Sequence, residues 1–241
     1  MSSGLADLTE LTARVGERLA DVRGRILRAG GDPAAITIVA VTKGFGADAV
    51  LAAVRNGLLD IGENYADELV AKAADVALAD PVAAAAIRWH FQGNLQTNKI
   101  NRLAPHVAVW QTISSANRAA SLAQRAPSAD VLVQVKLVGA ENRSGCAPPD
   151  VPELIAACRG LGLQVRGLMG VGPDPGDGPT APGALDGSAT AFGLLRDLAD
   201  VAALPVRSMG MSDDLEAAVR ASTTMIRVGS SLFGRRDKEL V

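Results

Sequence analysis

One lysine directly follows a long apolar run, and this is the first place where the sequence suggests chemistry. Residues 36–42 are almost all apolar or β-branched, which predicts a parallel strand buried on both faces. Lys43 comes next, and Gly44 and Gly46 let the chain turn sharply after it. Lys43 could simply lead the strand out to solvent. It could also be the electrostatic partner of a phosphorylated ligand, or a nucleophile that forms an imine with a carbonyl group.

Further polar residues stand where other predicted strands end. The ends of parallel strands meet at one mouth of a barrel, so these residues are candidates for a shared site. The groups are Glu63, Asn64 and Tyr65; His90 with residues 93–99; Gln134 and Lys136; residues 208–212; and residues 227–231. Gly210, Gly229 and Ser230 are small residues that let backbone N–H groups approach a phosphate. A helix beginning near Ser231 would point its positive end at the same phosphate.

Several of these residues also have ordinary explanations. A histidine inside a strand, such as His90, is more often a hydrogen-bonded core residue than a catalyst, and Asn64 could serve only to set a turn. Tyr65 is the only tyrosine and is expected to pack rather than react. Glu63 could act as a base or belong to an ordinary loop. The spacing of cysteines and histidines suits no metal site.

Short apolar runs and helical stretches alternate along the chain. An amphipathic helix is predicted between residues 5 and 26, where apolar residues recur every three or four positions. Strands are predicted at 36–42, 58–62, 87–92, 106–112, 130–137, 163–169, 205–209 and 224–228, and helices near 47–56, 66–78, 95–103, 115–126, 151–160, 189–202 and 213–221. This count favours an α/β fold, a (β/α)8 TIM barrel formed as a single domain by residues 1–241, with the segment 1–31 packing on it. A doubly wound open sheet is the alternative.

The composition limits the partners and the compartment. The chain has 241 residues, a net charge of -2 and no basic block, so we expect no surface for nucleic acid or membrane. The N-terminus lacks a signal-peptide pattern, and Cys146 and Cys158 are expected to stay reduced, so we expect a cytoplasmic protein. Residues 172–187 predict a long surface loop. Pro173 and Pro175 have no N–H to offer a phosphate, which argues against a dinucleotide-binding loop there.

Several short motifs occur in an order that is specific when they are taken together. They are Ala40–Lys43, Ile61–Tyr65, Trp89–Lys99, Arg143–Gly145, Gly167–Gly170, Ser208–Glu216 and Arg227–Gly234. Together they resemble the pyridoxal phosphate homeostasis protein family of alanine racemase-like barrels. The resemblance covers nearly the whole chain from about Ile36 onward, and the blocks Trp-His-Phe and Ser-Met-Gly-Met-Ser are its most specific parts.

The resemblance implies a fold, a cofactor and a set of binding residues. The fold is a barrel of the alanine racemase N-terminal domain type, and the cofactor is pyridoxal 5′-phosphate (PLP), held as an imine on Lys43. The phosphate would lie on the seventh and eighth loops, and Arg227 would face the pyridine nitrogen. The implied cofactor-binding set is Lys43, Asn64, His90, Ser208, Met209, Gly210, Arg227, Gly229 and Ser230.

The resemblance also implies binding without catalytic turnover. Arginine cannot accept a proton from the ring nitrogen, so the cofactor opposite Arg227 is a weak electron sink. Alanine racemases take a tyrosine base from a second domain, whereas here only a short segment follows Arg227 and Tyr65 is the only tyrosine. We therefore expect a PLP carrier, a monomer or weak dimer that hands PLP to PLP-dependent apoenzymes. Two alternatives stay open: a PLP-dependent racemase that uses Lys43 with Tyr65 or His90, and a cofactor-free aldolase in which Lys43 attacks a phosphorylated sugar.

The sequence departs from the family pattern at three positions. Gly46 stands where relatives commonly have proline, and Asn94 stands where histidine is frequent. Lys136 replaces a frequent asparagine and places an extra cation near the barrel mouth. That cation, like Arg227, would favour the neutral amine of Lys43 that a nucleophile requires. Lys136 could also serve as a second lysine in PLP transfer.

Overall fold

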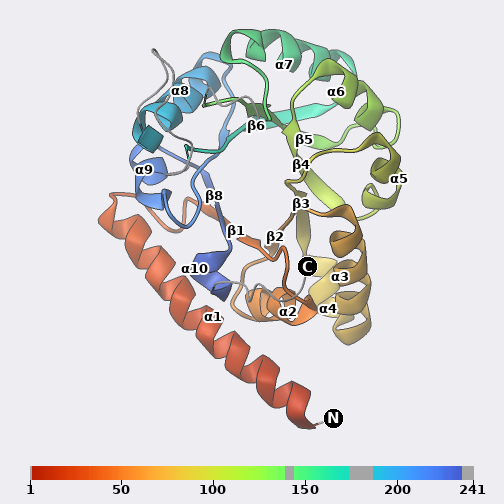
Figure 1. Ribbon diagram of the computed structural model, residues 1–241, viewed down its shortest axis with the longest axis vertical. Coiled ribbons are helices and arrows are strands. Elements are labelled where there is room, and N and C mark those ends of the chain that lie inside the picture. Colours follow the sequence, from red (N-terminus) through yellow and green to blue (C-terminus); the bar gives the residue numbers. More distant parts are fainter. Residues whose placement is uncertain (1, 139–143, 174–186, 235–241) are drawn as a thin grey trace.

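The computed structural model describes residues 2–138, 144–173 and 187–234, with side chains from residue 7 onward. Its strands close into a parallel barrel in sequence order, so the predicted (β/α)8 barrel is confirmed and the open sheet is wrong (Figure 1). The strands are β1 (Thr37–Val41), β2 (Asp60–Glu63), β3 (Arg88–Phe91), β4 (Val107–Ile113), β5 (Asp130–Val135), β6 (Gln164–Gly170), β7 (Val206–Ser208) and β8 (Met225–Val228). Every predicted strand overlaps one of them.

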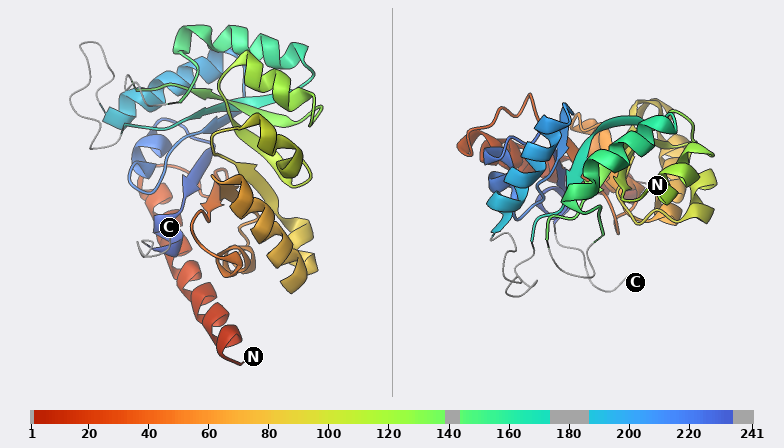
Figure 2. Two further views of the ribbon diagram at one scale, coloured as in Figure 1. Left: turned by 45° about the vertical axis from the view of Figure 1, so that its right-hand side comes forward. Right: turned by 90° about the horizontal axis from the view of Figure 1, so that it is seen from above.

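The helices lie around the outside of the strands, as the views in Figures 1 and 2 show. They are α1 (Ser2–Arg28), α2 (Ala47–Arg55), α3 (Ala66–Ala79), α4 (Pro81–Ala86), α5 (Ile100–Leu103), α6 (Ala116–Ala123), α7 (Val151–Gly160), α8 (Gly187–Val201), α9 (Leu215–Arg220) and α10 (Ser230–Phe233), with 3-10 turns at η1 (Thr97–Lys99) and η2 (Pro148–Asp150). All seven helices predicted after the N-terminal one have counterparts. The prediction at 95–103 corresponds to η1 followed by α5.

Helix α4 was not predicted, although the sequence carries its start signal. The Asp80 side chain caps the helix by accepting the backbone N–H of Ala83 at 2.9 Å, and Pro81 occupies the first turn, where its missing N–H costs nothing. The body of the helix is mostly alanine and has no apolar periodicity. A pattern search based on amphipathicity therefore cannot detect it.

Helix α1 packs on the outside of the barrel, against α2, α9 and α10. Its buried residues are Leu8, Val15, Leu19, Val22 and Ile26, spaced by three, four or seven positions as the amphipathic pattern predicts. Figure 1 shows the helix running beside α10 and α2, with its N-terminal end extending past the barrel. α1 therefore lies next to the last helices of the chain although it comes first in the sequence.

The interior of the barrel is only partly apolar. A small cluster inside the strands contains Val39, Val109, Leu132, Met169 and Met225. Barrel interiors are usually filled by branched apolar side chains. Here four polar residues, His90, Gln111, Ser208 and Arg227, are also buried inside, with exposed fractions of 4% or less. Such groups are tolerated in a core only when hydrogen bonds satisfy them.

Three further expectations concern the rest of the chain. The predicted loop at 172–187 falls mostly on residues 174–186, which lie outside the described residues. Cys146 and Cys158 are both free and buried, as expected for reduced thiols, and burial raises the pKa of Cys158 to about 11. Among the helices of the described ranges, none combines the length and apolar character needed to cross a membrane.

We predict that Gly167→Ala destabilises the barrel, because a Cβ there would lie 2.0 Å from the carbonyl oxygen of Val206 in β7. The expected loss in free energy of unfolding is about 1–3 kcal/mol, the usual cost of overpacking, measured by urea denaturation. Gly160→Ala at the end of α7, where a Cβ meets nothing within 4 Å, is the matched control. Equal effects of the two substitutions would contradict this account of the β6–β7 contact.

Candidate functional site

Lys43 lies just beyond β1, at the mouth formed by the C-terminal ends of the strands. β1 pairs with β8 in a register that places Val39 beside Arg227. A Cβ at Gly229 would lie 3.1 Å from the carbonyl oxygen of Val41, so the chain leaving β8 runs closely against the end of β1. The strand pairing therefore brings Lys43, Arg227 and Gly229 to the same part of the mouth.

A buried ion pair supports the end of β1 from the helix side. Lys72 of α3 and Glu63 of β2 are 7% and 0% exposed, and Nζ lies 2.6 Å from Oε1. Lys72 also donates to the carbonyl oxygen of Thr42 at 2.7 Å, and the Thr42 hydroxyl donates to Oε1 of Glu63 at 2.6 Å. Burial raises the pKa of Glu63, and the neighbouring ammonium of Lys72 opposes that rise. Glu63, which the sequence offered as a possible base, is thus part of a structural pair.

Glu68 connects this ion pair to the residue that follows Lys43. Oε2 of Glu68 accepts from Nζ of Lys72 at 2.9 Å and from the backbone N–H of Gly44, also at 2.9 Å. Residues 42 and 44 are both anchored, so the backbone at Lys43 is held between two fixed points. Sequence reasoning missed Lys72 and Glu68, because their i,i+4 spacing is equally typical of an exposed helix pair.

A chain of hydrogen bonds crosses the barrel interior and ends on Arg227. Nη1 of Arg227 donates to the Ser208 hydroxyl at 2.8 Å, and that hydroxyl lies 2.8 Å from Oε1 of Gln111. Nε2 of Gln111 lies 2.7 Å from Nδ1 of His90. Nε2 of His90 lies 2.8 Å from Oδ1 of Asp60, at the start of β2. The chain therefore runs from the mouth of the barrel to the opposite end of the strands.

The donors and acceptors in this chain fit one arrangement. Arginine can only donate, so Ser208 accepts from Arg227, and its hydroxyl donates to the Gln111 amide oxygen that faces it. The amide NH2 of Gln111 then faces Nδ1 of His90, which must be an acceptor. Nε2 of His90 then donates to Asp60.

Arg227 is a buried cation with few contacts to water. Its side chain is fixed by Ser208 and by the carbonyl oxygen of Gly170, which accepts from Nη2 at 2.8 Å. Burial lowers the pKa of Arg227 to about 10, and the negative charge of Asp214 opposes this. The guanidinium therefore remains charged at neutral pH, at the end of β8 and beside the lysine strand.

The structure places three predicted site residues behind the mouth. His90 and Ser208 are both 0% exposed, and their polar atoms are engaged in the chain described above. The Met209 side chain is also completely buried, and its backbone N–H donates to a β8 carbonyl at 3.0 Å. His90 and Ser208 are therefore positioned to support the site from within the barrel, whereas Met209 packs in the main core cluster together with residues of the helices.

The loops after β7 and β8 are joined to each other. Gly210 turns the first loop at a φ of +97°, and a Cβ there would lie 2.5 Å from the side chain of Ala218 in α9. Gly229 precedes the first turn of α10, which begins at Ser230. Between the loops, the backbone N–H of Ser231 donates to Oγ of Ser212 at 3.1 Å. The residues predicted to surround a phosphate thus lie on two loops that are hydrogen-bonded to each other.

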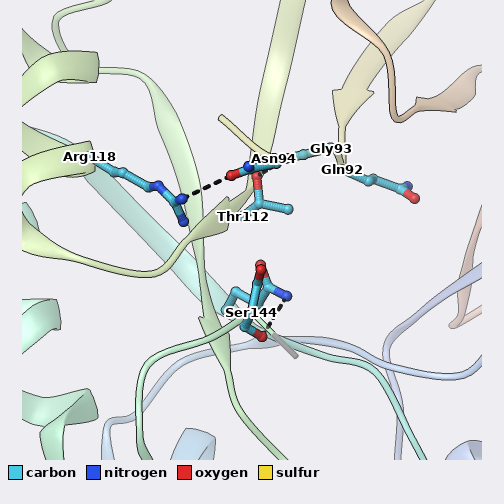
Figure 3. Close-up of a pocket in the computed structure, with 7 residues that line it drawn as sticks. Gln92, Gly93, Asn94, Thr112, Arg118 and Ser144 are labelled. Carbon is cyan, nitrogen blue, oxygen red and sulfur yellow. Dashed lines mark hydrogen bonds between the residues drawn. The ribbon is translucent and has the colours of Figure 1, made fainter. Parts of the chain in front are cut away.

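A polar cavity of about 90 Å³ lies at the ends of β3, β4 and β5 (Figure 3). Arg118 reaches toward it from α6 and donates to Oδ1 of Asn94 at 2.9 Å. In this view Thr112 lies between this pair and Ser144, whose carbonyl oxygen accepts from the amide of Gln134 at 3.0 Å. Asn94 and Gln134 were predicted at the mouth, and they lie on the side formed by the middle strands.

Two buried amide atoms near the mouth lack a hydrogen-bond partner among the described residues. They are Oδ1 of Asn64 and Nε2 of Gln92. A Cβ at Gly62 would lie 2.6 Å from Nε2 of Gln92, so this amide covers β2 next to the lysine strand. An unsatisfied buried polar group costs about 1–3 kcal/mol, and a polar ligand can supply the missing contact. The mouth therefore fits a polar ligand.

The remaining candidates are less enclosed. Tyr65 is 56% exposed and precedes α3. Lys136 is half-buried after β5, and its backbone N–H donates to the carbonyl oxygen of Cys146 at 2.8 Å. Within the part of the chain that the structure describes, no group of three or more histidine, cysteine or acidic residues could hold a metal.

We predict that Lys72→Met lowers the free energy of unfolding by about 3–5 kcal/mol, because it leaves the buried Glu63 carboxylate without its partner. The double variant Lys72→Met/Glu63→Gln should recover much of this loss in urea denaturation. Lys99→Ala, which breaks an exposed pair with Asp67, is the control and should cost below about 1 kcal/mol. A Lys72 variant no less stable than the control would show that the pair does not anchor β1.

Comparisons with known proteins agree on the family. The chain matches the model of the alanine racemase N-terminal domain over residues 21–237. It is 39% identical over 234 residues to the pyridoxal phosphate homeostasis protein of Pseudomonas aeruginosa, covering 92% of this chain and 96% of that protein.

Solved structures with a similar fold cover nearly the whole chain. A crystal structure of a protein from Bifidobacterium adolescentis has a TM-score of 0.81 at 28% identity, covering 95% of this chain and 96% of that one. PipY of Synechococcus elongatus, in a structure with PLP bound, has a TM-score of 0.73 at 30% identity, covering 91% of this chain and 100% of PipY. The chain therefore belongs to the alanine racemase N-terminal domain family and, within it, to the pyridoxal phosphate homeostasis proteins.

Proposed function

We propose that this protein binds PLP through Lys43 and acts in PLP homeostasis without catalytic turnover. The relative from Pseudomonas aeruginosa is named for that role, and PipY has been solved with PLP bound. The observation that carries the proposal is the pairing of β1 with β8, which brings a lysine and a buried arginine to the same part of the barrel mouth. PLP supplies an aldehyde that a lysine amine can capture, and a ring nitrogen that a cation can face.

The residues at the mouth fit the parts of this cofactor. Gly210, Gly229 and Ser230 would receive the phosphate in the loops after β7 and β8, where small residues let the backbone approach closely. Arg227 would donate to the ring nitrogen. Asn64 would use its unsatisfied buried oxygen near the lysine.

Other members of the predicted set would act from behind the mouth. Ser208 accepts from Arg227 and His90 supports Gln111, so these residues would orient the guanidinium rather than contact PLP. Met209 would fix the course of the loop after β7, because its amide is bonded to β8. Gln92 is an addition to the set, since its amide nitrogen is also buried without a partner among the described residues.

The same geometry argues for holding the cofactor rather than for racemisation. Arg227 cannot take a proton from the ring nitrogen, so a bound cofactor would stabilise a carbanion poorly. The two residues that could have assisted Lys43 are poorly placed for proton transfer. His90 has both ring nitrogens engaged inside the barrel, and Tyr65 is largely exposed before α3.

The setting of this role is also part of the proposal. We propose a cytoplasmic carrier, a monomer or weak dimer, that delivers PLP to PLP-dependent apoenzymes. The name of the relatives and the two free, buried thiols support it. Turnover of amino-acid enantiomers by the purified protein at rates typical of enzymes would favour the racemase alternative.

We predict that Lys43→Ala abolishes the visible absorbance of the protein incubated with PLP and dialysed, because the Lys72 amine at the same turn is buried in its pair with Glu63. Lys136→Ala is the matched control, since it removes a lysine from the same mouth and should retain the colour. An undiminished absorbance in the Lys43 variant would show that PLP binds elsewhere.

We also predict that Arg227→Glu shifts the absorbance spectrum of bound PLP, because a carboxyl group can share a proton with the ring nitrogen and a guanidinium cannot. Arg166→Gln, which removes an exposed arginine paired with Asp130, should leave the spectrum unchanged. Identical spectra for the wild type and the Arg227 variant would remove Arg227 from the ring nitrogen.

A further inference from the structure

We infer that Arg25 of α1 is a positioning residue for the phosphate of PLP, because it clamps together the loops after β7 and β8 from outside the barrel. The inference rests on the proposed cofactor-binding function. It concerns a helix that is additional to the eight βα units of the barrel and that the predicted site did not include.

Arg25 forms a two-point ion pair with Glu216 at the start of α9. Nε lies 2.6 Å from Oε1 and Nη2 lies 2.8 Å from Oε2, the parallel geometry in which guanidinium and carboxylate interact most strongly. The pair lowers the pKa of Glu216 to about 2, so the carboxylate stays charged throughout the neutral range. This contact fixes the direction of the guanidinium.

The same guanidinium also reaches both phosphate loops. Nη2 donates to the carbonyl oxygen of Ser212, after β7, at 2.9 Å, and Nη1 lies 3.4 Å from Oγ of Ser231, after β8. Ser231 and Ser212 are bonded to each other as well, at 3.1 Å. The planar fork of arginine meets the carboxylate at two points and still reaches the two loops, a two-point geometry that a lysine ammonium cannot reproduce.

These anchor points lie next to the residues proposed to hold the phosphate. Ser212 follows Gly210 by two positions, and Ser231 directly follows Ser230. Loops rich in glycine and serine lose conformational freedom when they close around a ligand. A clamp that orders them beforehand reduces that loss, so it strengthens phosphate binding without touching the phosphate.

The position of α1 makes this coupling specific. Figure 1 shows α1 running beside α10, and the helix packs against α9 as well. Lys43 and Arg227 are held by other contacts, from α3 and from the barrel interior. Loss of the clamp should therefore weaken the binding of the phosphate and leave the binding of the aldehyde and of the ring unchanged.

The test compares PLP with pyridoxal, which has the aldehyde and the ring but no phosphate. In Arg25→Ala and in Glu216→Gln, the Kd for PLP should rise about tenfold, the effect expected when a charge-assisted contact is lost at a partly exposed site. The Kd for pyridoxal should change less than about twofold, within the scatter of near-neutral substitutions. Arg14→Ala, which breaks an exposed pair with Glu10 on the same helix, is the matched control and should leave both constants unchanged.

Each other outcome overturns the inference. Equal weakening for PLP and pyridoxal would mean that Arg25 only maintains the fold, and unchanged constants would mean that the loops do not need the clamp. If Arg25→Ala does not fold, Arg25→Lys and Glu216→Gln provide the same comparison. Wild-type protein that retains neither ligand would overturn the proposed function itself, and this result is obtained before any variant is measured.

Discussion

One buried arginine ends the chain of hydrogen bonds that runs through the barrel interior. Arg227 can only donate hydrogen bonds, so Ser208 accepts from it, and the Ser208 hydroxyl donates to the amide oxygen of Gln111 that faces it. The amide NH2 of Gln111 faces Nδ1 of His90, whose other ring nitrogen is bonded to Asp60. A cation removed from water is costly unless it is hydrogen-bonded, and the Ser208 hydroxyl and the Gly170 carbonyl oxygen each accept from it. The interior is therefore organised to present a fixed positive charge at the mouth.

Three separate supports meet at that mouth. The interior chain orients the arginine, the buried Glu63–Lys72 pair holds the turn that carries Lys43, and the contacts between Ser212 and Ser231 join the loops after β7 and β8. Their common effect is to reduce the freedom of the groups proposed to meet PLP, which favours tight and oriented binding. In the proposed site, the group that faces the ring nitrogen is a cation that can only donate hydrogen bonds. A site built to stabilise carbanions has an acid in that place.

The fold could be predicted from the sequence because alternation of apolar runs and helices is a local property that a barrel requires. The position of Lys43 could also be predicted, because the apolar run that ends directly before it marks the strand. How deeply His90 and Ser208 lie inside the barrel could not be predicted. A strand pattern tells which face a residue occupies, but not which layer of the barrel it lies in. The Glu63–Lys72 pair was missed because its burial depends on how α3 packs against β1 and β2, which no short motif encodes.

The most direct test of the account is the mass of the protein after incubation with PLP and borohydride reduction, followed by peptide mapping. Reduction makes the bond between a lysine and PLP permanent, so the anchor can be located by sequence. The account predicts one phosphopyridoxyl group, on the peptide that contains Lys43. No adduct, or an adduct confined to another lysine such as Lys136, would contradict it.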